Sequence, residues 1–523
     1  METPAVNSPP RPGFFRRLFA WRRVRKVLFV LAALITLGAL FFAEEDWRGA
    51  RAWANYKRDM EAKGERFDAA RLIPPKVPDA QNFAMTPFLA PIFNLTLEDQ
   101  GKPKKLIANG GNDLTEEPEV EAKRGTNIAA NLPDKVNPPR RFTFQYGLAS
   151  DLLLWAAAFK GTNSAPAPAE SSDPVHAASI VLDNLKTCEP TLAELQAASA
   201  RPSSRFNIPY EEWESQPVQS ALVEHFTIVR GLARILTLHA EAEMVLGRTD
   251  QALQDIRLMF RVEDGLKDEP LLLSQLVRNA CMAVILQSVG EGLAEQRWSE
   301  AQLRVLQDRL QKTDLLGSFV QALYGERDIC NNLNFDRGFD YVTITPRGWD
   351  RFEQINVNRA FQDMVFARIY LAARVVSPSV NHSIDLDFQE FSKESGFHAI
   401  VVQHSLYARM LMPIFSRLPE KIALAQNNVD LAMVACALER YRLAQGEYPV
   451  DLNALVPRFA AALPHDIING QPLKYRRTDN GRFILYSVGW NEKDDGGVVA
   501  TKGNPPREDT EQGDWVWQYP QLP

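Results

Sequence analysis

The stretch RRVRKVLFVLAALITLGALFFAEED, residues 22–46, decides the architecture of this chain. Its centre, Val27–Ala43, is an uncharged apolar run of 17 residues. A bilayer core needs about 17–25 such residues. Seven basic residues precede the run and three acids follow it directly. Because basic flanks stay on the cytoplasmic side, we predict one transmembrane helix over 27–43, with the N-terminus in the cytoplasm and the bulk of the chain across the membrane.

A cleaved signal peptide is the alternative interpretation of this run. Cleavage requires small residues just before the cut, yet the run ends in Leu40-Phe41-Phe42-Ala43, with Phe where a small residue is needed. A buried core helix would leave the asymmetric flanking charges unexplained. We therefore favour an uncleaved anchor, preceded by a basic cytoplasmic tail over residues 1–26.

The charge distribution limits the classes of partner that the protein can be expected to bind. The first 26 residues carry a net charge of +6 and the whole chain −6, so the remainder carries −12. An acidic exterior disfavours nucleic acid and anionic membrane surfaces, and it tolerates divalent cations. We expect the lipid bilayer as a partner through residues 27–43, a protein partner that the sequence does not identify, and no nucleic acid.

Motifs that carry chemistry are missing from the sequence. It contains no HExxH, no GxSxG, no phosphate-binding loop and no GxGxxG, so we expect no enzymatic activity. The alternative function is an envelope hydrolase with a carboxylate site in the helical part of the chain. The acid pairs available to such an enzyme are Glu211 with Glu212, Glu263 with Asp264, and Asp385 with Asp387.

The 523 residues are long enough for two to four domains, with a composition typical of globular proteins. Residues 44–140 are predicted as an extended juxtamembrane region with loops and short strands, although 47–71 has helical composition. Residues 141–415 are predicted as a helical domain. Its helix signals include capping boxes at Thr191/Glu194 and Ser299/Gln302 and a longer helix over 356–376. The thiols of Cys281 and Cys436 fall in apolar helical stretches, which indicates buried residues.

One segment of the helical domain, residues 240–253, resembles a tetratricopeptide-type helical hairpin. The resemblance lies in the small residues of AEAEMVLGRTDQAL, with Leu246-Gly247 at the turn and Ala252 in the second helix. A repeat of 34 residues is not evident, so a generic antiparallel helical pair is an equal alternative.

The last fifth of the chain changes character. A helix is predicted from Pro419 to Gln445, apolar on two sides and stopped by Gly446. Two strand-like runs follow, and the turn Asp479-Asn480-Gly481 between them is a strong hairpin signal. The polar loop 489–497 and the closing Asp514-Trp515 complete this module.

This module resembles the head of the major pseudopilin of type II secretion systems. The matching features are the helix ending in Gly446-Glu447-Tyr448-Pro449, Leu463-Pro464 with Asp466, the strand at 483–489, the Asp495-Gly496-Gly497 loop and Asp514. The resemblance implies, over residues 416–523, a pseudopilin-like head of one helix and an antiparallel sheet. Together with the transmembrane helix and the helical middle domain, this predicts a mainly α protein with a small C-terminal α+β domain.

In that family the loop after the last long strand binds calcium, which takes about 6–8 oxygen ligands. The resemblance therefore implies a calcium site here, and a solvated turn is the alternative. The residues predicted to supply oxygen ligands are Ser487, Asn491, Asp494, Asp495 and Asp514.

The departures from the family matter for function. The apolar run 27–43 contains no acid and no prepilin-peptidase junction precedes it, so we expect no polymerisation into a filament. The resemblance places the protein in the inner membrane of a bacterium, with its bulk in the periplasm. The expected function is that of a membrane-anchored extracytoplasmic interaction or scaffold protein, linked to secretion or envelope assembly, with a calcium-stabilised head.

Overall fold

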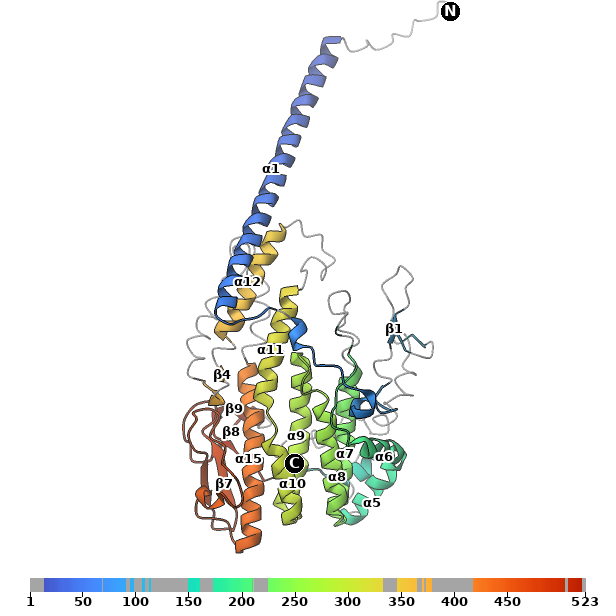
Figure 1. The fold of residues 1–523 in the computed structure, drawn as a ribbon, viewed down its shortest axis with the longest axis vertical. Coiled ribbons are helices and arrows are strands. Elements are labelled where there is room, and N and C mark those ends of the chain that lie inside the picture. The colour runs from blue at the N-terminus through green and yellow to red at the C-terminus, as the bar shows by residue number, and fades with distance from the viewer. Residues whose placement is uncertain are drawn as a thin grey trace, which may run out of the picture. The chain divides into compact units, whose positions relative to one another are not determined.

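A computed structural model describes residues 14–67, 69–90, 95–97, 106–108, 112–113, 149–159, 173–208, 210, 224–332, 346–364, 369–370, 373–378, 417–503 and 507–519. The chain is mainly helical, with a small sheet portion near the C-terminus (Figure 1). It divides into two compact units. The first unit comprises Met1–Phe67, Leu333–Arg359 and Ser392–Met410, and the second comprises Asp68–Asn332, Ala360–Phe391 and Leu411–Pro523.

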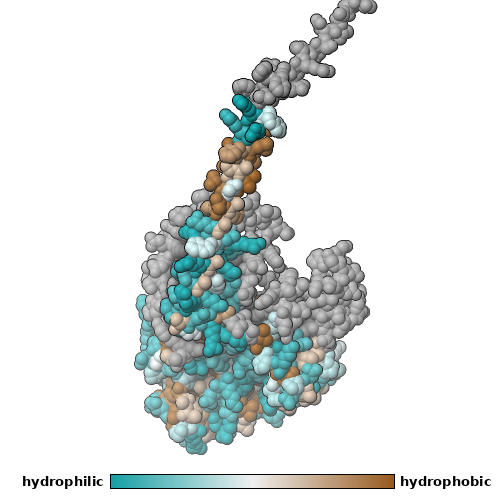
Figure 2. Space-filling view, turned by 45° about the horizontal axis from the view of Figure 1, so that its top comes forward, coloured by the Kyte–Doolittle hydropathy of each residue, from teal (hydrophilic) through white to brown (hydrophobic). Residues whose placement is uncertain are grey.

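The first unit is built on α1, a helix of 49 residues over Phe14–Ala62. The apolar run lies within it, and α1 continues outward only to Ala62, so the helical composition up to residue 71 overstated its length. Gly64 follows the helix end at φ +93°, a backbone conformation that glycine adopts readily and residues with a Cβ atom rarely adopt. Figure 2 shows the apolar run as a hydrophobic band on α1, with hydrophilic residues at both ends.

A second helix, α12 (Arg347–Met364), packs on α1 through a contact between glycines. A Cβ atom at Gly49 would lie 2.2 Å from the Gly348 carbonyl oxygen, so the two backbones touch. The Gly348 N–H donates to Asp46 Oδ1 at 2.8 Å, and Trp349 Nε1 donates to Glu45 Oε2 at 3.2 Å. The start of α12 is therefore fixed beside residues 45–49 of α1.

The second unit contains the helical layer. Its helices are α4 (Leu152–Phe159), α5 (Pro174–Leu185), α6 (Glu189–Ala198), α7 (Glu224–Val245), α8 (Thr249–Asp264), α9 (Leu272–Ala294), α10 (Glu300–Gln311), α11 (Leu315–Asn332) and α15 (Leu418–Gln445). The helices α7 and α8 contact each other and are joined around Leu246-Gly247, with Gly247 at φ +77°, as either a tetratricopeptide-type hairpin or a generic helical pair would be.

Two predicted elements differ from the structure. The helix placed at 356–376 is α12, which begins at Arg347 and ends at Met364, and the short strands β4 (Ile369–Tyr370) and β5 (Val375–Val376) follow it. The capping box at Ser299/Gln302 is present at the start of α10. Thr191 instead lies inside α6, whose first turn contains Pro190, and Glu194 Oε1 accepts the Phe88 N–H at 2.9 Å.

Helix α9 lies at the centre of this unit. It contacts α7, α8, α11 and α15. It is also the second described helix that is long and apolar enough to cross a membrane, but most of its apolar window is buried inside the protein, whereas that of α1 is fully exposed. Of these two helices, the only ones of this kind in the described part of the chain, α1 presents its apolar side chains outward and α9 is a core helix.

The C-terminal helix α15 belongs to the same core. It contacts α9, α10 and α11, and Figure 1 shows it beside α10. Gln426 Oε1 accepts the Leu315 N–H at 2.8 Å near one end of α15, and Arg440 bonds to α10 near the other. Gly446, at φ +87°, ends the helix as predicted. Residues 416–523 thus share a core with the helices of 141–415.

After α15 in the sequence, the chain forms a small antiparallel sheet in the order β10-β7-β6 and a separate β8–β9 ribbon. The predicted hairpin is present, with Arg477 paired to Phe483 across the Asn480-Gly481 turn. A third sheet, β1-β2-β3, lies within 95–113, where short strands were expected. The strands are β1 (Leu95–Leu97), β2 (Leu106–Ala108), β3 (Asn112–Asp113), β6 (Lys474–Arg477), β7 (Phe483–Ser487), β8 (Val499–Lys502), β9 (Arg507–Gly513) and β10 (Trp515–Val516).

Candidate functional site

Asp514 organises the loop that the sequence predicts as a calcium site. Its side chain is buried, and burial raises the pKa of the carboxyl group. Three backbone N–H groups donate to it: Gly497 at 2.6 Å, Asp495 at 3.2 Å and Val498 at 3.3 Å. Both carboxylate oxygens therefore accept hydrogen bonds from the loop itself.

The other four predicted ligands have partners of their own. Asp494 accepts from Tyr486 Oη at 2.9 Å and pairs with Lys474 Nζ at 3.2 Å. These contacts, led by the Tyr486 hydroxyl, lower the pKa of Asp494. Asn491 Nδ2 donates to Asp495 Oδ2 at 2.9 Å. Ser487 Oγ donates to the buried Asp466 at 2.8 Å, which makes Asp466 a structural residue of the same loop.

Each of these five side chains therefore takes part in a hydrogen bond or ion pair with a neighbouring group of the protein. Across the described residues, no group of three His, Cys, Asp or Glu side chains is placed to share a metal ion. The donor set fits a loop closed by Asp514 and Asp466 better than a calcium shell of about 6–8 oxygens. A calcium ion here would compete with Lys474 for Asp494, and calcium at this loop stays a prediction.

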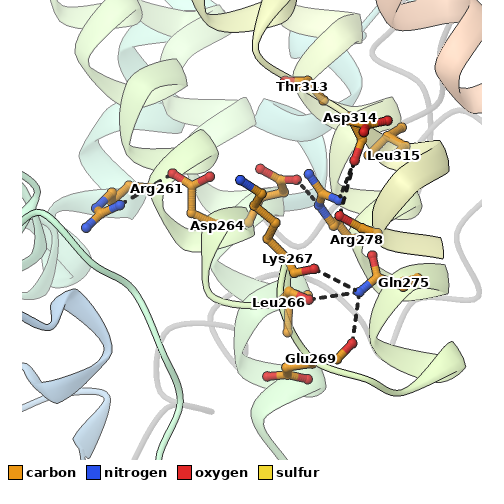
Figure 3. A network of polar contacts seen from close by, with 12 residues as sticks. Arg261, Asp264, Leu266, Lys267, Glu269, Gln275, Arg278, Thr313, Asp314 and Leu315 are labelled. Atoms are coloured by element: carbon orange, nitrogen blue, oxygen red, sulfur yellow. Dashed lines mark hydrogen bonds and ion pairs between the residues drawn. The ribbon is translucent and has the colours of Figure 1, made fainter. Parts of the chain in front are cut away.

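The acid pair Glu263 and Asp264 lies in an ion-pair network at the end of α8 (Figure 3). Arg278 donates to Glu263 Oε1, and Arg309 Nη2 lies 3.1 Å from Glu263 Oε2 and 2.7 Å from Asp264 Oδ1. Arg261 adds a contact of 3.4 Å to Asp264. Since three guanidinium groups satisfy these two carboxylates, the pair joins α8, α9 and α10 rather than facing a substrate. Glu211, Glu212, Asp385 and Asp387 lie outside the described residues.

Gln275, in the first turn of α9, holds the turn between α8 and α9. Its Nε2 atom lies 3.0 Å from the Leu266 carbonyl oxygen, 3.2 Å from that of Glu269 and 3.3 Å from that of Lys267 (Figure 3). The buried amide thereby satisfies backbone acceptors of a turn that has no strand partner. The role of this cluster is structural.

A different pair of carboxyl groups meets between α7 and α9. Glu241 is 2 % exposed, and its side chain is in hydrogen-bonding contact with that of Glu291. Ser288 Oγ donates to Glu241 Oε1 at 3.3 Å. Glu291 Oε1 accepts the Ser150 N–H at 2.9 Å and Gln287 Nε2 at 3.0 Å. No donor group of the described protein reaches Glu241 Oε2.

Two ionised carboxylates cannot occupy this site together, because neither has a proton to donate and no cationic side chain is in contact with the pair in the described structure. Burial first, and then the charge of Glu291, raises the pKa of Glu241 well above its usual value. Burial likewise raises the pKa of Glu291, to about 7. The pair therefore retains a proton near neutral pH, as an acid–base pair requires.

The sequence reasoning missed this pair. The two residues are separated by 50 positions, as their numbers give, and neither belongs to a motif. The available signal was Glu241 itself, a charged residue between Ala240 and Ala242 on a helix whose neighbouring positions are apolar. Such a residue on a buried stripe must find a partner, although its sequence does not say which one.

Comparisons with protein-family models, with curated proteins and with solved structures found no match to this chain.

Proposed function

We propose that this protein is a membrane-anchored extracytoplasmic interaction protein, held in the bacterial inner membrane by α1. The single observation that carries this proposal is the exposure of the apolar run: Phe29 is 76 % exposed, Ile35 65 % and Leu34 63 %. A continuous apolar band of this size is costly in water and stable in lipid. The basic residues before it and the acids after it favour an N-terminus in the cytoplasm.

The rest of the chain suits a binding role. The layer α5–α11 together with α15 is a rigid helical body, and helical hairpins such as α7–α8 commonly present binding surfaces. The C-terminal sheet adds a second surface, for which the pseudopilin resemblance suggests a partner in secretion or envelope assembly. Calcium at the 487–514 loop belongs to the same resemblance.

Topology reporters test the membrane anchor and its orientation, on which this proposal rests. We would fuse one of two reporters to the C-terminus. Alkaline phosphatase is active only outside the cytoplasm, and green fluorescent protein folds poorly outside the cytoplasm. The expected result is an active phosphatase, a dark fluorescent fusion, resistance to alkaline extraction, and retention of an epitope at residue 2. Loss of that epitope would indicate a cleaved signal peptide. Release of the protein from the membrane at alkaline pH would show that α1 is not a transmembrane anchor.

The Glu241–Glu291 pair favours a second candidate, an envelope hydrolase. A protonated carboxyl beside an ionised one can donate a proton to a leaving group while its partner activates water, as the hydrogen-bonded carboxyl pair of aspartic proteases does in peptide hydrolysis. Ser150 and Gln287 would hold Glu291 in position for this step. The chemistry needs no cofactor.

Amide variants of the pair test this candidate. Purified protein would be incubated with an unfolded protein substrate and with cell-wall fragments, and new ends would be counted by mass spectrometry. Glu241→Gln and Glu291→Gln should each abolish any turnover. The control is Glu326→Gln, because Glu326 is also a glutamate whose pKa burial raises, bound to the Leu272 N–H at 3.0 Å. Equal turnover in all variants would exclude the pair as the hydrolytic site.

A further inference from the structure

The part of α1 directly beyond the apolar run carries an exposed aromatic residue, Trp47, next to the point where α12 begins. Trp21 and Trp47 lie on either side of the apolar run, and both are 61 % exposed. At 1.5 Å per residue their separation along a helix is about 39 Å. The hydrocarbon core and interfaces of a bilayer together span about 40–45 Å, and tryptophan favours the interfaces. This spacing places Trp47 at the far interface.

The start of α12 is tied to the same height. The Gly348 N–H donates to Asp46 Oδ1 and Trp349 Nε1 to Glu45 Oε2, at residues directly preceding Trp47. A Cβ atom at Gly348 would lie 1.9 Å from the Glu45 carbonyl oxygen, so no side chain separates the helices there. Arg347, the first residue of α12, is exposed beside this crossing.

The charges at this height match a phospholipid headgroup. Arg51 is exposed, and its guanidinium lies 5.5 Å from the centre of the Trp47 ring. Guanidinium groups bind phosphate oxygens in a fork geometry, and an aromatic ring at the interface holds such a group among the headgroups. Three acids lie at the same level: Glu45 pairs with Arg48 and accepts the Trp349 indole N–H, Asp46 accepts the Gly348 N–H, and Glu44 is exposed.

We propose that residues 47–51 of α1, directly beyond the apolar run, and the first turn of α12 form one contact with phospholipid headgroups, in which Arg51 and Arg347 bind lipid phosphates and Trp47 lies in the interface. This inference rests on the proposed membrane span. It makes α12 a second, peripheral membrane element, so that residues about 300 positions apart in the sequence touch the same leaflet.

Spin labels in the full chain, reconstituted in nanodiscs with anionic lipid, measure the depth of each position. Leu34→Cys, Arg347→Cys and Lys57→Cys would be labelled separately in a Cys330→Ser background. The three other cysteines are buried and do not compete for label. Accessibility to oxygen, which concentrates in lipid, is compared with accessibility to a water-soluble nickel chelate. We expect lipid at residue 34, the phosphate level at 347 and water at 57.

The outcomes separate the two proposals. Lipid at 34 with water at 347 would overturn the headgroup contact and leave the anchor intact, whereas water at 34 would remove the anchor as well. In a Gly348→Leu background, which forces α12 away from α1, the label at 347 should move into water while the label at 34 stays in lipid.

A second measurement tests the arginines. The double variant Arg51→Ala/Arg347→Ala should retain about fivefold less anionic lipid for each arginine removed, measured by mass spectrometry of the purified complex. The double variant Lys57→Ala/Arg58→Ala, which loses the same charge farther along α1, should retain the wild-type amount. Equal losses in both variants would indicate attraction by net charge alone and overturn the specific contact.

Discussion

Arg440 of α15 and Glu300 of α10 form a two-point ion pair across a sequence separation of 140 residues. Arg440 Nε and Nη2 lie 3.0 Å and 2.9 Å from Glu300 Oε1, while Nη1 donates to Gln307 Oε1 and to the Phe459 carbonyl oxygen, each at 2.9 Å. Arg440 is buried, with 6 % of the residue exposed. One buried side chain therefore joins the C-terminal segment to the helical layer.

Replacement of Arg440 should weaken this junction. We expect Arg440→Ala to lower the free energy of unfolding by about 2–4 kcal/mol, because buried acceptors lose a charged donor. Chemical unfolding of the detergent-solubilised chain measures the change. The matched control is Arg304→Ala, which removes an exposed partner of the same Glu300 atom and should cost less than about 0.5 kcal/mol. Similar losses in both variants would contradict the role of burial.

The isolated C-terminal segment should not fold cooperatively. Residues 417–523 alone would expose the face of α15 that covers α9, α10 and α11, where Leu431, Val434 and Leu438 are fully buried. We expect a broad thermal transition and self-association, measured by circular dichroism and sedimentation. A sharp transition of a monomeric fragment would show that this segment is an independent domain.

Gly292 provides the space that Trp298 occupies. A Cβ atom at position 292 would lie 2.2 Å from Trp298 Nε1, and the buried indole donates to the Val289 carbonyl oxygen at 3.2 Å. Gly292→Ala should therefore lower the free energy of unfolding by about 1–3 kcal/mol. In a Trp298→Ala background the same change should be neutral or stabilising, because alanine is the better helix former. A loss that is unchanged in that background would refute the steric explanation.

The pH dependence of stability reports on Glu291. Its pKa in the folded chain, about 7, lies above the usual value of 4.5. The folded state therefore binds more protons than the unfolded state between these values, so this carboxyl lowers stability as the pH rises from about 4.5 to 7. Glu291→Gln should flatten this part of the curve, because the amide can donate to Glu241 at every pH. Unfolding measured from pH 4 to pH 8 checks the effect, and parallel curves would contradict it.

The loop at 487–514 should be stable without a metal ion. Asp514→Ala removes the acceptor of three backbone N–H groups and should cost about 2–3 kcal/mol. Asp494→Ala removes only the contacts of an exposed carboxylate and should lower the melting temperature less than Asp514→Ala does. A chelator should leave the melting temperature of the full chain unchanged. A drop in chelator, reversed by calcium and absent in Asp494→Ala and Asp495→Ala, would instead establish the calcium site.

Local signals in the sequence predicted local structure well. The Asn480-Gly481 turn, the stop at Gly446 and the Ser299/Gln302 capping box each depend on a few adjacent residues, and all three are present. The box at Thr191 was wrong because Pro190 already suits the first turn of a helix that begins at Glu189.

Distant pairings could not be predicted in the same way. A helix that is apolar on two sides, such as α15, must be covered twice, but its pattern does not name the helices that cover it. The same holds for Glu241, whose buried position demands a partner that lies on another helix. The pairs that matter here, Arg440 with Glu300 and Glu241 with Glu291, are set by tertiary packing.

The position of α15 in the core also governs the order in which the chain can fold. Ribosomes release α9, α10 and α11 about a hundred residues before α15, whose last residue is Gln445. Until then, the parts of these three helices that α15 covers in the folded chain remain exposed and open to misassociation. Completion of the helical layer is thus a late event of biosynthesis, and nascent chains that stop before Leu418 are natural clients for chaperones.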